Sequence, residues 1–276
     1  MMSSPKKMSK RTTADLARLI SRIERRDSEI FPVLESIFKK RDRAPVLGIT
    51  GPPGVGKSTL VDRLIKHYRD REYTVAVVAV DPSSPFSGGA ILGDRVRMQR
   101  HSEDEGVFIR SMSTRGHLGG LNASIYDVVV ALSDSGFDRI ILETVGVGQG
   151  EVEVSYCSDL TALVLVAAYG DSIQLIKAGV QEIAECYVIN KIDQYEPDKL
   201  EADLHRMSED VENLKIYPVS ALSGEGVGEF VSALESLLEN VRSDPDHRDS
   251  ITRNHTEGLL REELGSAVEE TLSQHN

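Results

Sequence analysis

The sequence predicts an α/β fold with a doubly wound, mostly parallel β-sheet and helices on both of its faces. From Pro45 onward, short runs rich in β-branched residues alternate with helical stretches of about ten or more residues, the succession that builds such a sheet. The short runs are apolar on successive residues rather than on alternate ones, as in strands buried on both faces. A length of 276 residues suffices for one large domain with appendages or for two small domains.

This pattern extends over residues 45–241, which we expect to form the central domain. Seven strands are expected, at 46–50, 75–80, 107–110, 139–142, 160–167, 184–190 and 216–220. Five helices are expected between and after them, at 57–71, 121–135, 172–179, 197–214 and 228–241. Residues 242–276 begin with the polar linker SDPDHRDS and continue into a final helix candidate at 256–272.

Residues 1–44 are expected to form a short tail and a helical hairpin. Apolar residues recur at the spacing of one helix face over 16–23, and a second helix is expected at 30–38. Residues 1–11 are basic, rich in serine and free of acidic residues, which is also the composition of a mitochondrial transit peptide. Acidic residues begin at Asp15, however, and leave fewer residues than such signals usually need. We therefore favour a tail in a cytoplasmic protein.

The composition excludes several classes of function. The chain has 32 Lys and Arg against 44 Asp and Glu, a formal net charge of −12 and a pI near 5.1. Such an acidic chain repels nucleic-acid phosphates, so no nucleic-acid partner is expected. No stretch approaches the ~20 apolar residues that span a bilayer, so no membrane partner is expected either. The two cysteines, Cys157 and Cys186, can form neither a disulfide framework nor a CxxC metal pair, and a soluble, intracellular protein is expected.

A phosphate-binding loop is predicted at residues 51–58. The sequence GPPGVGKS follows the apolar run VLGIT and precedes the apolar-periodic helix TLVDRLIKHY, so G-x-x-x-x-G-K-[ST] stands in its strand–loop–helix context. Glycines let backbone N–H groups and the helix N-terminus surround a β-phosphate. Lys57 is expected to reach the β- and γ-phosphates, and the Ser58 hydroxyl to bind Mg²⁺. The predicted phosphate-binding residues are Gly51, Gly54, Val55, Gly56, Lys57, Ser58 and Thr59.

Two later segments predict which nucleotide base the chain binds. The sequence NKID at 190–193 ends the predicted strand ECYVIN, where a parallel sheet places its ligand-binding loops. The Asp193 carboxylate can accept hydrogen bonds from N1–H and the exocyclic amine of guanine, which adenine does not offer in that arrangement. The sequence SAL at 220–222 resembles the last guanine-binding segment of G proteins, in which a backbone N–H meets the guanine carbonyl oxygen. The ligand is therefore expected to be GTP or GDP, not ATP. The predicted base-binding residues are Asn190, Lys191, Asp193, Ser220, Ala221 and Leu222.

Three acidic residues are candidates for the region of Mg²⁺ and the γ-phosphate. Asp81 ends the second predicted strand, Asp94 lies in the loop that follows it, and Glu143 ends the strand RIILE. For any one of them, a solvated loop carboxylate or a helix cap is the alternative. G proteins usually have D-x-x-G where this chain has Glu143-Thr-Val-Gly146. The longer Glu side chain is expected to reach the metal through a water molecule.

Several longer stretches taken together are more specific than any single motif: GPPGVGKST, VDPSSPFSGGAILGDRVRM, RSMSTRGHLGGL, ETVGVGQGE, GDSIQLIKAG and NKID. In them, residues 12–240 resemble the MeaB/ArgK-type P-loop GTPases, which guard adenosylcobalamin loading into methylmalonyl-CoA mutase. The resemblance implies a parallel-sheet G domain with N-terminal helices and a C-terminal helical dimerisation element. The final helix could supply that element with its apolar residues Leu259, Leu260, Leu264, Val268 and Leu272.

The same resemblance implies roles for individual residues. A first switch would lie between Asp81 and about Arg110, and a second would start at Glu143 and include Gln149. The segment 170–179 would be a third switch that faces the mutase; the alternative is an ordinary exposed helix. The residues implied to surround Mg²⁺ are Ser58, Asp81, Asp94 and Glu143. The residues implied to act in catalysis are Lys57, Glu143, Gln174 and Lys177.

The function expected from the resemblance is an Mg²⁺-dependent GTPase, a homodimer that gates adenosylcobalamin loading into methylmalonyl-CoA or a related acyl-CoA mutase and protects that enzyme. Adenosylcobalamin would reach it only through the partner. One alternative is a nickel metallochaperone GTPase, which needs a paired Cys or His site; both cysteines are expected in the core, and His101 and His117 have no ligand-type neighbours in sequence. A transport-associated nucleotidase or kinase is a second alternative, which NKID disfavours. A non-enzymatic scaffold is a third, which the intact Lys57-Ser58 pair disfavours.

Overall fold

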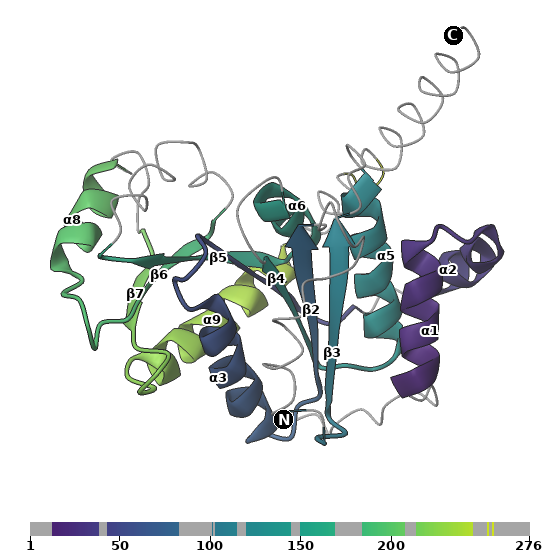
Figure 1. The fold of residues 1–276 in the computed structure, drawn as a ribbon, viewed down its shortest axis with the longest axis horizontal. Helices are drawn as coiled ribbons and strands as arrows, with labels where there is room; N and C mark the ends of the chain where they lie inside the picture. Colours follow the sequence, from purple (N-terminus) through teal and green to yellow (C-terminus); the bar gives the residue numbers. More distant parts are fainter. Residues whose placement is uncertain are drawn as a thin grey trace, which may run out of the picture.

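The computed structural model describes residues 13–38, 43–82, 101, 103–114, 120–144, 150–168, 184–207, 214–244, 253 and 256. Within them, one seven-stranded sheet runs in the order β3-β2-β4-β1-β5-β6-β7 (Figure 1). Every neighbouring pair of strands is parallel, so the predicted fold class is confirmed. The strands are β1 (Val46–Thr50), β2 (Val75–Pro82), β3 (Val107–Thr114), β4 (Arg139–Thr144), β5 (Leu160–Val166), β6 (Cys186–Asn190) and β7 (Ile216–Val219).

Helices cover both faces of the sheet because successive strand residues point to opposite sides. In β4, Ile140 and Leu142 join the apolar cluster under α5, whereas Ile141 joins the cluster under α3 and α9. A third cluster packs α8 against β5 and β6. The helices are α1 (Thr13–Glu24), α2 (Phe31–Phe38), α3 (Lys57–Arg69), α5 (Gly120–Asp134), α6 (Gly150–Cys157), α8 (Asp198–Met207) and α9 (Val227–Ser243), with a 3₁₀ turn at Ser28–Ile30.

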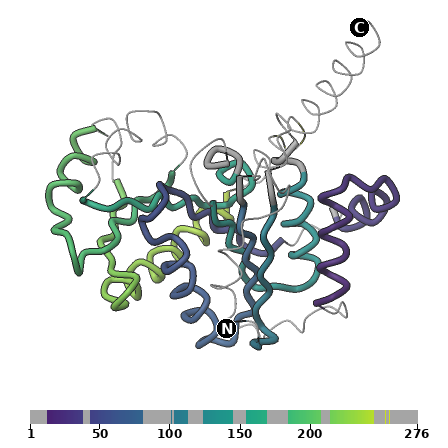
Figure 2. The backbone as a smooth tube through the Cα atoms, in the orientation of Figure 1, coloured from purple at the N-terminus to yellow at the C-terminus, as the bar shows by residue number. Residues whose placement is uncertain are grey.

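The N-terminal hairpin packs beside α5, at the end of the molecule opposite α8 (Figure 2). Helix α1 buries Leu16, Ile20 and Ile23, three positions of the predicted apolar face. Arg110 of β3 donates to Glu24 Oε2 at 2.7 Å. The hairpin therefore shares its apolar cluster with the sheet and is joined to it by an ion pair.

Apart from shifts of one or two residues at other element ends in the described part of the chain, two elements differ from the sequence-based expectation. Strand β3 extends to Thr114 rather than ending at Arg110, because its polar continuation pairs with β2 up to Pro82↔Thr114. Helix α6 was not expected, since GEVEVSYC shows no helical apolar periodicity; it packs on the sheet through Val154 and Cys157. The expected helix at 172–179, the tail at 1–11, the linker after 244 and, apart from Thr256, the expected helix at 256–272 lie outside the described residues. None of the helices in the described part of the chain is both long and apolar enough to traverse a bilayer.

Candidate functional site

The predicted phosphate loop connects the carboxyl end of β1 to the first turn of α3. Its backbone takes positive φ angles that favour glycine, +140° at Gly51 and +97° at Gly56. A Cβ on Gly51 would lie 2.2 Å from the Val164 carbonyl oxygen of β5, so a side chain there would collide with the sheet. The chain consequently turns directly from a buried strand into a helix N-terminus, where backbone N–H groups and the helix dipole favour an anion.

Lys57 holds its ammonium group inside this loop. The side chain is 6% exposed, and Nζ donates hydrogen bonds to the carbonyl oxygens of Gly51 at 2.5 Å and Pro52 at 2.9 Å. A buried cation encircled by a loop of backbone amides is suited to a phosphate group.

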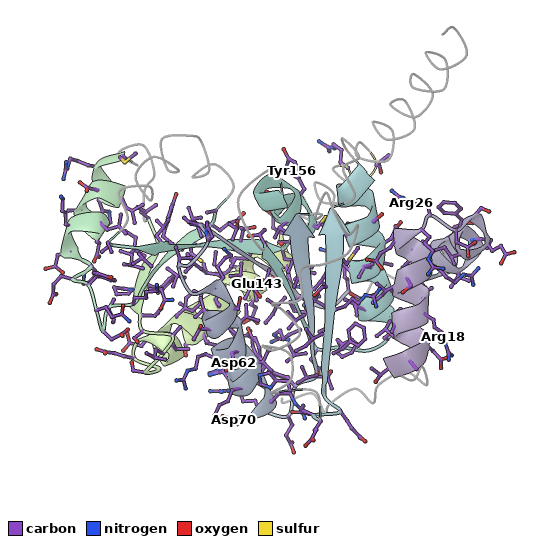
Figure 3. The ribbon with its side chains drawn as sticks, viewed as in Figure 1. Arg18, Arg26, Asp62, Asp70, Glu143 and Tyr156 are labelled. Atoms are coloured by element: carbon purple, nitrogen blue, oxygen red, sulfur yellow. The ribbon has the colours of Figure 1, made fainter. Side chains whose placement is uncertain are left out.

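Glu143 lies beside the N-terminal end of α3 (Figure 3). There it meets Ser58. The Ser58 hydroxyl donates to Glu143 Oε1 at 2.5 Å, and the Glu143 side chain is buried, with 5% exposed. The β-sheet register explains the meeting, because Glu143 pairs with Ile49 of β1, just before the phosphate loop. A hydroxyl and a carboxylate oxygen side by side are the hard donors that Mg²⁺ prefers, so this donor pair fits the predicted metal.

The other predicted metal ligands remain predictions. Asp81 lies in β2, which pairs with β4, but its side chain is outside the described residues, as is all of Asp94. Among the residues that the structure describes, no group of three or more His, Cys, Asp or Glu is arranged to hold a metal ion.

Asn190 links the phosphate loop to the predicted base loop. It ends β6 opposite Val219 of β7 and is buried, with 2% exposed. Its Nδ2 donates to the Val55 carbonyl oxygen at 2.8 Å, and its Oδ1 accepts from the Ala221 N–H at 2.9 Å. One side chain thus fixes the spacing between the two predicted halves of the nucleotide site.

Asp193 lies on the exposed side of the same loop pair. Its Oδ1 accepts a hydrogen bond from the Ser220 hydroxyl at 2.5 Å, and its Oδ2 accepts one from Gln194 Nε2 at 3.3 Å. The Ser220 hydrogen bond is the main cause that holds the pKa of Asp193 below its ordinary value. This lowering favours the ionised carboxylate, the form that accepts hydrogen bonds from guanine. Lys191 takes a left-handed backbone conformation, φ +66°, at the turn between them.

Several other predicted positions lie apart from this site or outside the described residues. Cys157 and Cys186 are buried in the apolar core, as expected, and burial raises the pKa of the Cys186 thiol. His101 Nε2 lies 2.7 Å from Asp62 Oδ1 of α3. Gly146, Gln149, His117, Gln174 and Lys177 fall among the residues that are not described.

Sequence reasoning missed Arg63, which joins α3 to the predicted base loop. Its Nε donates to the Ala221 carbonyl oxygen at 2.8 Å, and its Nη2 donates to that of Leu222. In sequence it is one polar residue within an amphipathic helix, so no local signal distinguishes it.

Comparison with known proteins decides the family. A family profile described as "Methylmalonyl Co-A mutase-associated GTPase MeaB" matches residues 16–275. The chain belongs to the MeaB family. The predicted MeaB/ArgK resemblance is thus confirmed, and the match continues past residue 240, where the predicted resemblance ends.

Relatives of this MeaB-family chain include proteins named as GTPases. A Pyrococcus abyssi protein named as a GTPase is 42% identical over 97% of this chain and 80% of its own length. GTPase ArgK of Escherichia coli is 44% identical over 53% of this chain and 44% of its own length. The Mus musculus methylmalonic aciduria type A homolog is 39% identical over 71% of this chain and 49% of its own length. The match thus covers about half of the length of the last two relatives.

Solved structures show the same fold. A structure titled "LAO/AO transport system kinase" has a TM-score of 0.63 at 23% identity and covers 96% of this chain and 87% of its own. The hydrogenase maturation factor HypB of Archaeoglobus fulgidus has a TM-score of 0.54 at 20% identity and covers 82% of this chain and 99% of its own. The MeaB-family chain therefore has the architecture of P-loop GTPases.

Proposed function

We propose that this chain binds GTP and GDP with Mg²⁺, hydrolyses GTP, and uses this cycle to gate adenosylcobalamin loading into a methylmalonyl-CoA or related acyl-CoA mutase and to protect that enzyme. The observation that carries the proposal is the Asn190 bridge, which contacts both the Val55 carbonyl oxygen and the Ala221 N–H. It holds a loop suited to phosphates next to a loop that presents an ionised acceptor, Asp193, for guanine.

In the proposed reaction, the nucleotide lies along the carboxyl edge of the sheet. Loop N–H groups, the α3 N-terminus and the Lys57 ammonium hold the β- and γ-phosphates. Ser58, Asp81, Asp94 and, through a water molecule, Glu143 would hold Mg²⁺, which when bound would neutralise charge that develops on the phosphate oxygens. Glu143 orients the attacking water from its buried position beside Ser58. The water oxygen bonds to the γ-phosphorus while the bond from that phosphorus to the β–γ bridging oxygen breaks. One proton of the water passes to an oxygen of the phosphate formed, and GDP and phosphate leave.

The partner is inferred from the family. The matching profile carries methylmalonyl-CoA mutase in its description, and the mouse relative is named for methylmalonic aciduria. Adenosylcobalamin would belong to the mutase and reach this chain only through it. In the proposal, the segment 170–179 faces the mutase, with Gln174 and Lys177 moving toward the nucleotide, and residues 242–276 pair two chains in a cytoplasmic homodimer.

The proposal is tested by GTP turnover of the full chain, alone and with an adenosylcobalamin-dependent acyl-CoA mutase. We expect slow turnover alone, which stops when Mg²⁺ is chelated, and stimulation by the mutase. GTPases that lack a cation at the γ-phosphate are slower by about 10³–10⁵-fold. Lys177→Ala should abolish the stimulation and keep the slow rate, whereas the control Lys199→Ala, at an exposed lysine of α8, should change neither.

Two results would contradict parts of the proposal. Equal stimulation of Lys177→Ala and the native chain removes Lys177 from the mechanism. Absence of stimulation by any cobalamin-dependent mutase refutes the proposed partner while leaving nucleotide binding to be judged by its own measurement.

A further inference from the structure

Arg63 makes a two-pronged contact that the phosphate and base motifs do not account for. It lies on α3, more than one turn beyond Ser58, and is half-buried. Its Nε and Nη2 donate to two successive carbonyl oxygens, those of Ala221 and Leu222. A planar guanidinium can hold both oxygens at once, whereas a lysine ammonium offers only a point charge.

Holding a carbonyl oxygen also fixes the direction of an N–H group. In a planar trans peptide, the C=O of one residue and the N–H of the next point in opposite directions. Because Arg63 holds the Ala221 oxygen at 2.8 Å, the N–H of Leu222 in that same peptide points away from α3. Its direction is set by Arg63 rather than by the Leu222 side chain, which is 68% exposed.

The neighbouring N–H groups of the loop have other acceptors. The Ala221 N–H donates to Asn190 Oδ1 at 2.9 Å. The Ser223 N–H donates to Ser220 Oγ at 3.2 Å. The Leu222 N–H lies between these two in the chain, and Asp193 is tied to the same loop through its 2.5 Å hydrogen bond from Ser220.

We propose that Arg63 is a positioning residue that aims the Leu222 N–H at the 6-oxygen of bound guanine. This role for Arg63 rests on the proposed function, since it requires that guanine nucleotides bind at this loop. Asp193 would read the N1–H and 2-amino edge, and Leu222 would read the 6-oxo group. Arg63 would contribute by fixing the loop before the nucleotide arrives, which lowers the ordering cost of binding.

The test uses nucleotides that differ at one position of the base. Binding constants for GDP, 6-thio-GDP and IDP are measured at neutral pH with the native chain, Arg63→Gln and Arg63→Lys. 6-Thio-GDP replaces only the 6-oxygen, by the weaker acceptor sulfur, and IDP lacks only the 2-amino group. Lys66→Gln is the control, because Lys66 is an exposed residue of the same helix whose Nζ pairs with Asp70 at 2.9 Å.

The native chain should prefer GDP over 6-thio-GDP by about 3- to 10-fold, the range for one net hydrogen bond. In Arg63→Gln, the ratio of GDP affinity to 6-thio-GDP affinity should fall close to one, and GDP binding should weaken about tenfold. Arg63→Lys should show smaller changes in the same two quantities. The preference for GDP over IDP should stay within about twofold in both variants, because Asp193 is unchanged. Lys66→Gln should match the native chain.

A purely structural role for Arg63 would weaken binding of all three nucleotides by one factor and leave both preferences intact; that result overturns the proposal. A native chain that does not distinguish GDP from 6-thio-GDP overturns it as well. A native chain that binds no guanine nucleotide refutes the proposed function itself.

If Arg63→Gln does not fold, the amide proton resonance of Leu222 is measured in the native chain. This resonance should differ between the GDP and 6-thio-GDP complexes; an unchanged resonance counts against the proposal.

Discussion

Replacing Gly56 by alanine should damage both stability and nucleotide binding, because it strains the backbone and displaces the Asn190 side chain. Gly56 precedes α3 with a φ of +97°, and a Cβ there would lie 2.4 Å from Asn190 Nδ2. A left-handed backbone costs an L-residue about 1–2 kcal/mol. Moving Asn190 aside gives up its hydrogen bonds to Val55 and Ala221, each worth about 0.5–1.5 kcal/mol. The expected loss in free energy of unfolding is about 2–5 kcal/mol.

The measurement is urea unfolding, with GDP affinity measured on the same proteins. The control is Gly228→Ala in the first turn of α9, where an added Cβ meets no atom within 4 Å. A glycine-to-alanine change in such a helix position should stabilise by about 0.4–1 kcal/mol. GDP affinity should fall at least about tenfold in Gly56→Ala and stay unchanged in Gly228→Ala. If Gly56→Ala unfolds at the native urea midpoint and binds GDP normally, the Asn190 bridge does not have the importance assigned to it.

Three further substitutions test the chemistry of the site. Asp193→Asn should weaken GTP binding and raise the relative affinity for xanthosine triphosphate, whose base has an acceptor where guanine has a donor; an unchanged preference would refute the base assignment. Ser220→Ala should raise the pKa of Asp193 toward its ordinary value, because the Ser220 hydroxyl is the main cause of its lowering. Protonation of Asp193 removes the preference for GDP over IDP, so as the pH falls the variant should lose this preference at a higher pH than the native chain. Identical titrations of the Asp193 carboxyl in the two proteins would contradict this. Glu143→Gln should keep GDP affinity within a few-fold and strongly reduce hydrolysis, since its place beside Ser58 puts it at the proposed water and metal position; a normal rate would remove Glu143 from the reaction.

Local sequence signals sufficed for most of the fold. The core strands β1, β5 and β6 are continuous apolar runs, and a run of this kind predicts a strand buried on both faces without knowledge of its neighbours. The end of β3 could not be predicted in this way, because its residues past Arg110 are strand only through their pairing with β2. Helix α6 was missed for a similar reason: its burial depends on the sheet beneath it and not on an apolar repeat of its own.

The residues of the candidate site likewise fall into those that a local motif predicts and those that only long-range contacts reveal. Lys57, Ser58 and Asp193 belong to short motifs whose spacing is informative in sequence, and the structure places them at one edge of the sheet. The contacts that hold those motifs in register join residues far apart in the chain. Asn190 reaches Val55, and Arg63 reaches Ala221; both contacts depend on strand order, which no local pattern encodes.

Helix α3 unites these long-range contacts. Its apolar face is buried against the sheet through Leu60, Leu64 and Tyr68. Its polar residues point to two separate segments, as its Arg69 Nε donates to Asp104 at 2.9 Å on one side and Arg63 holds the base loop on the other.

Because side chains on one rigid helix keep fixed spacings, the proposed phosphate site at the start of α3 and the proposed guanine site share a support. A substitution that loosens the packing of α3, such as Leu64→Ala, removes a buried side chain distant from any nucleotide motif. It would nevertheless weaken phosphate binding and base discrimination together. The phosphate loop runs directly into α3, and Arg63 of α3 holds the base loop.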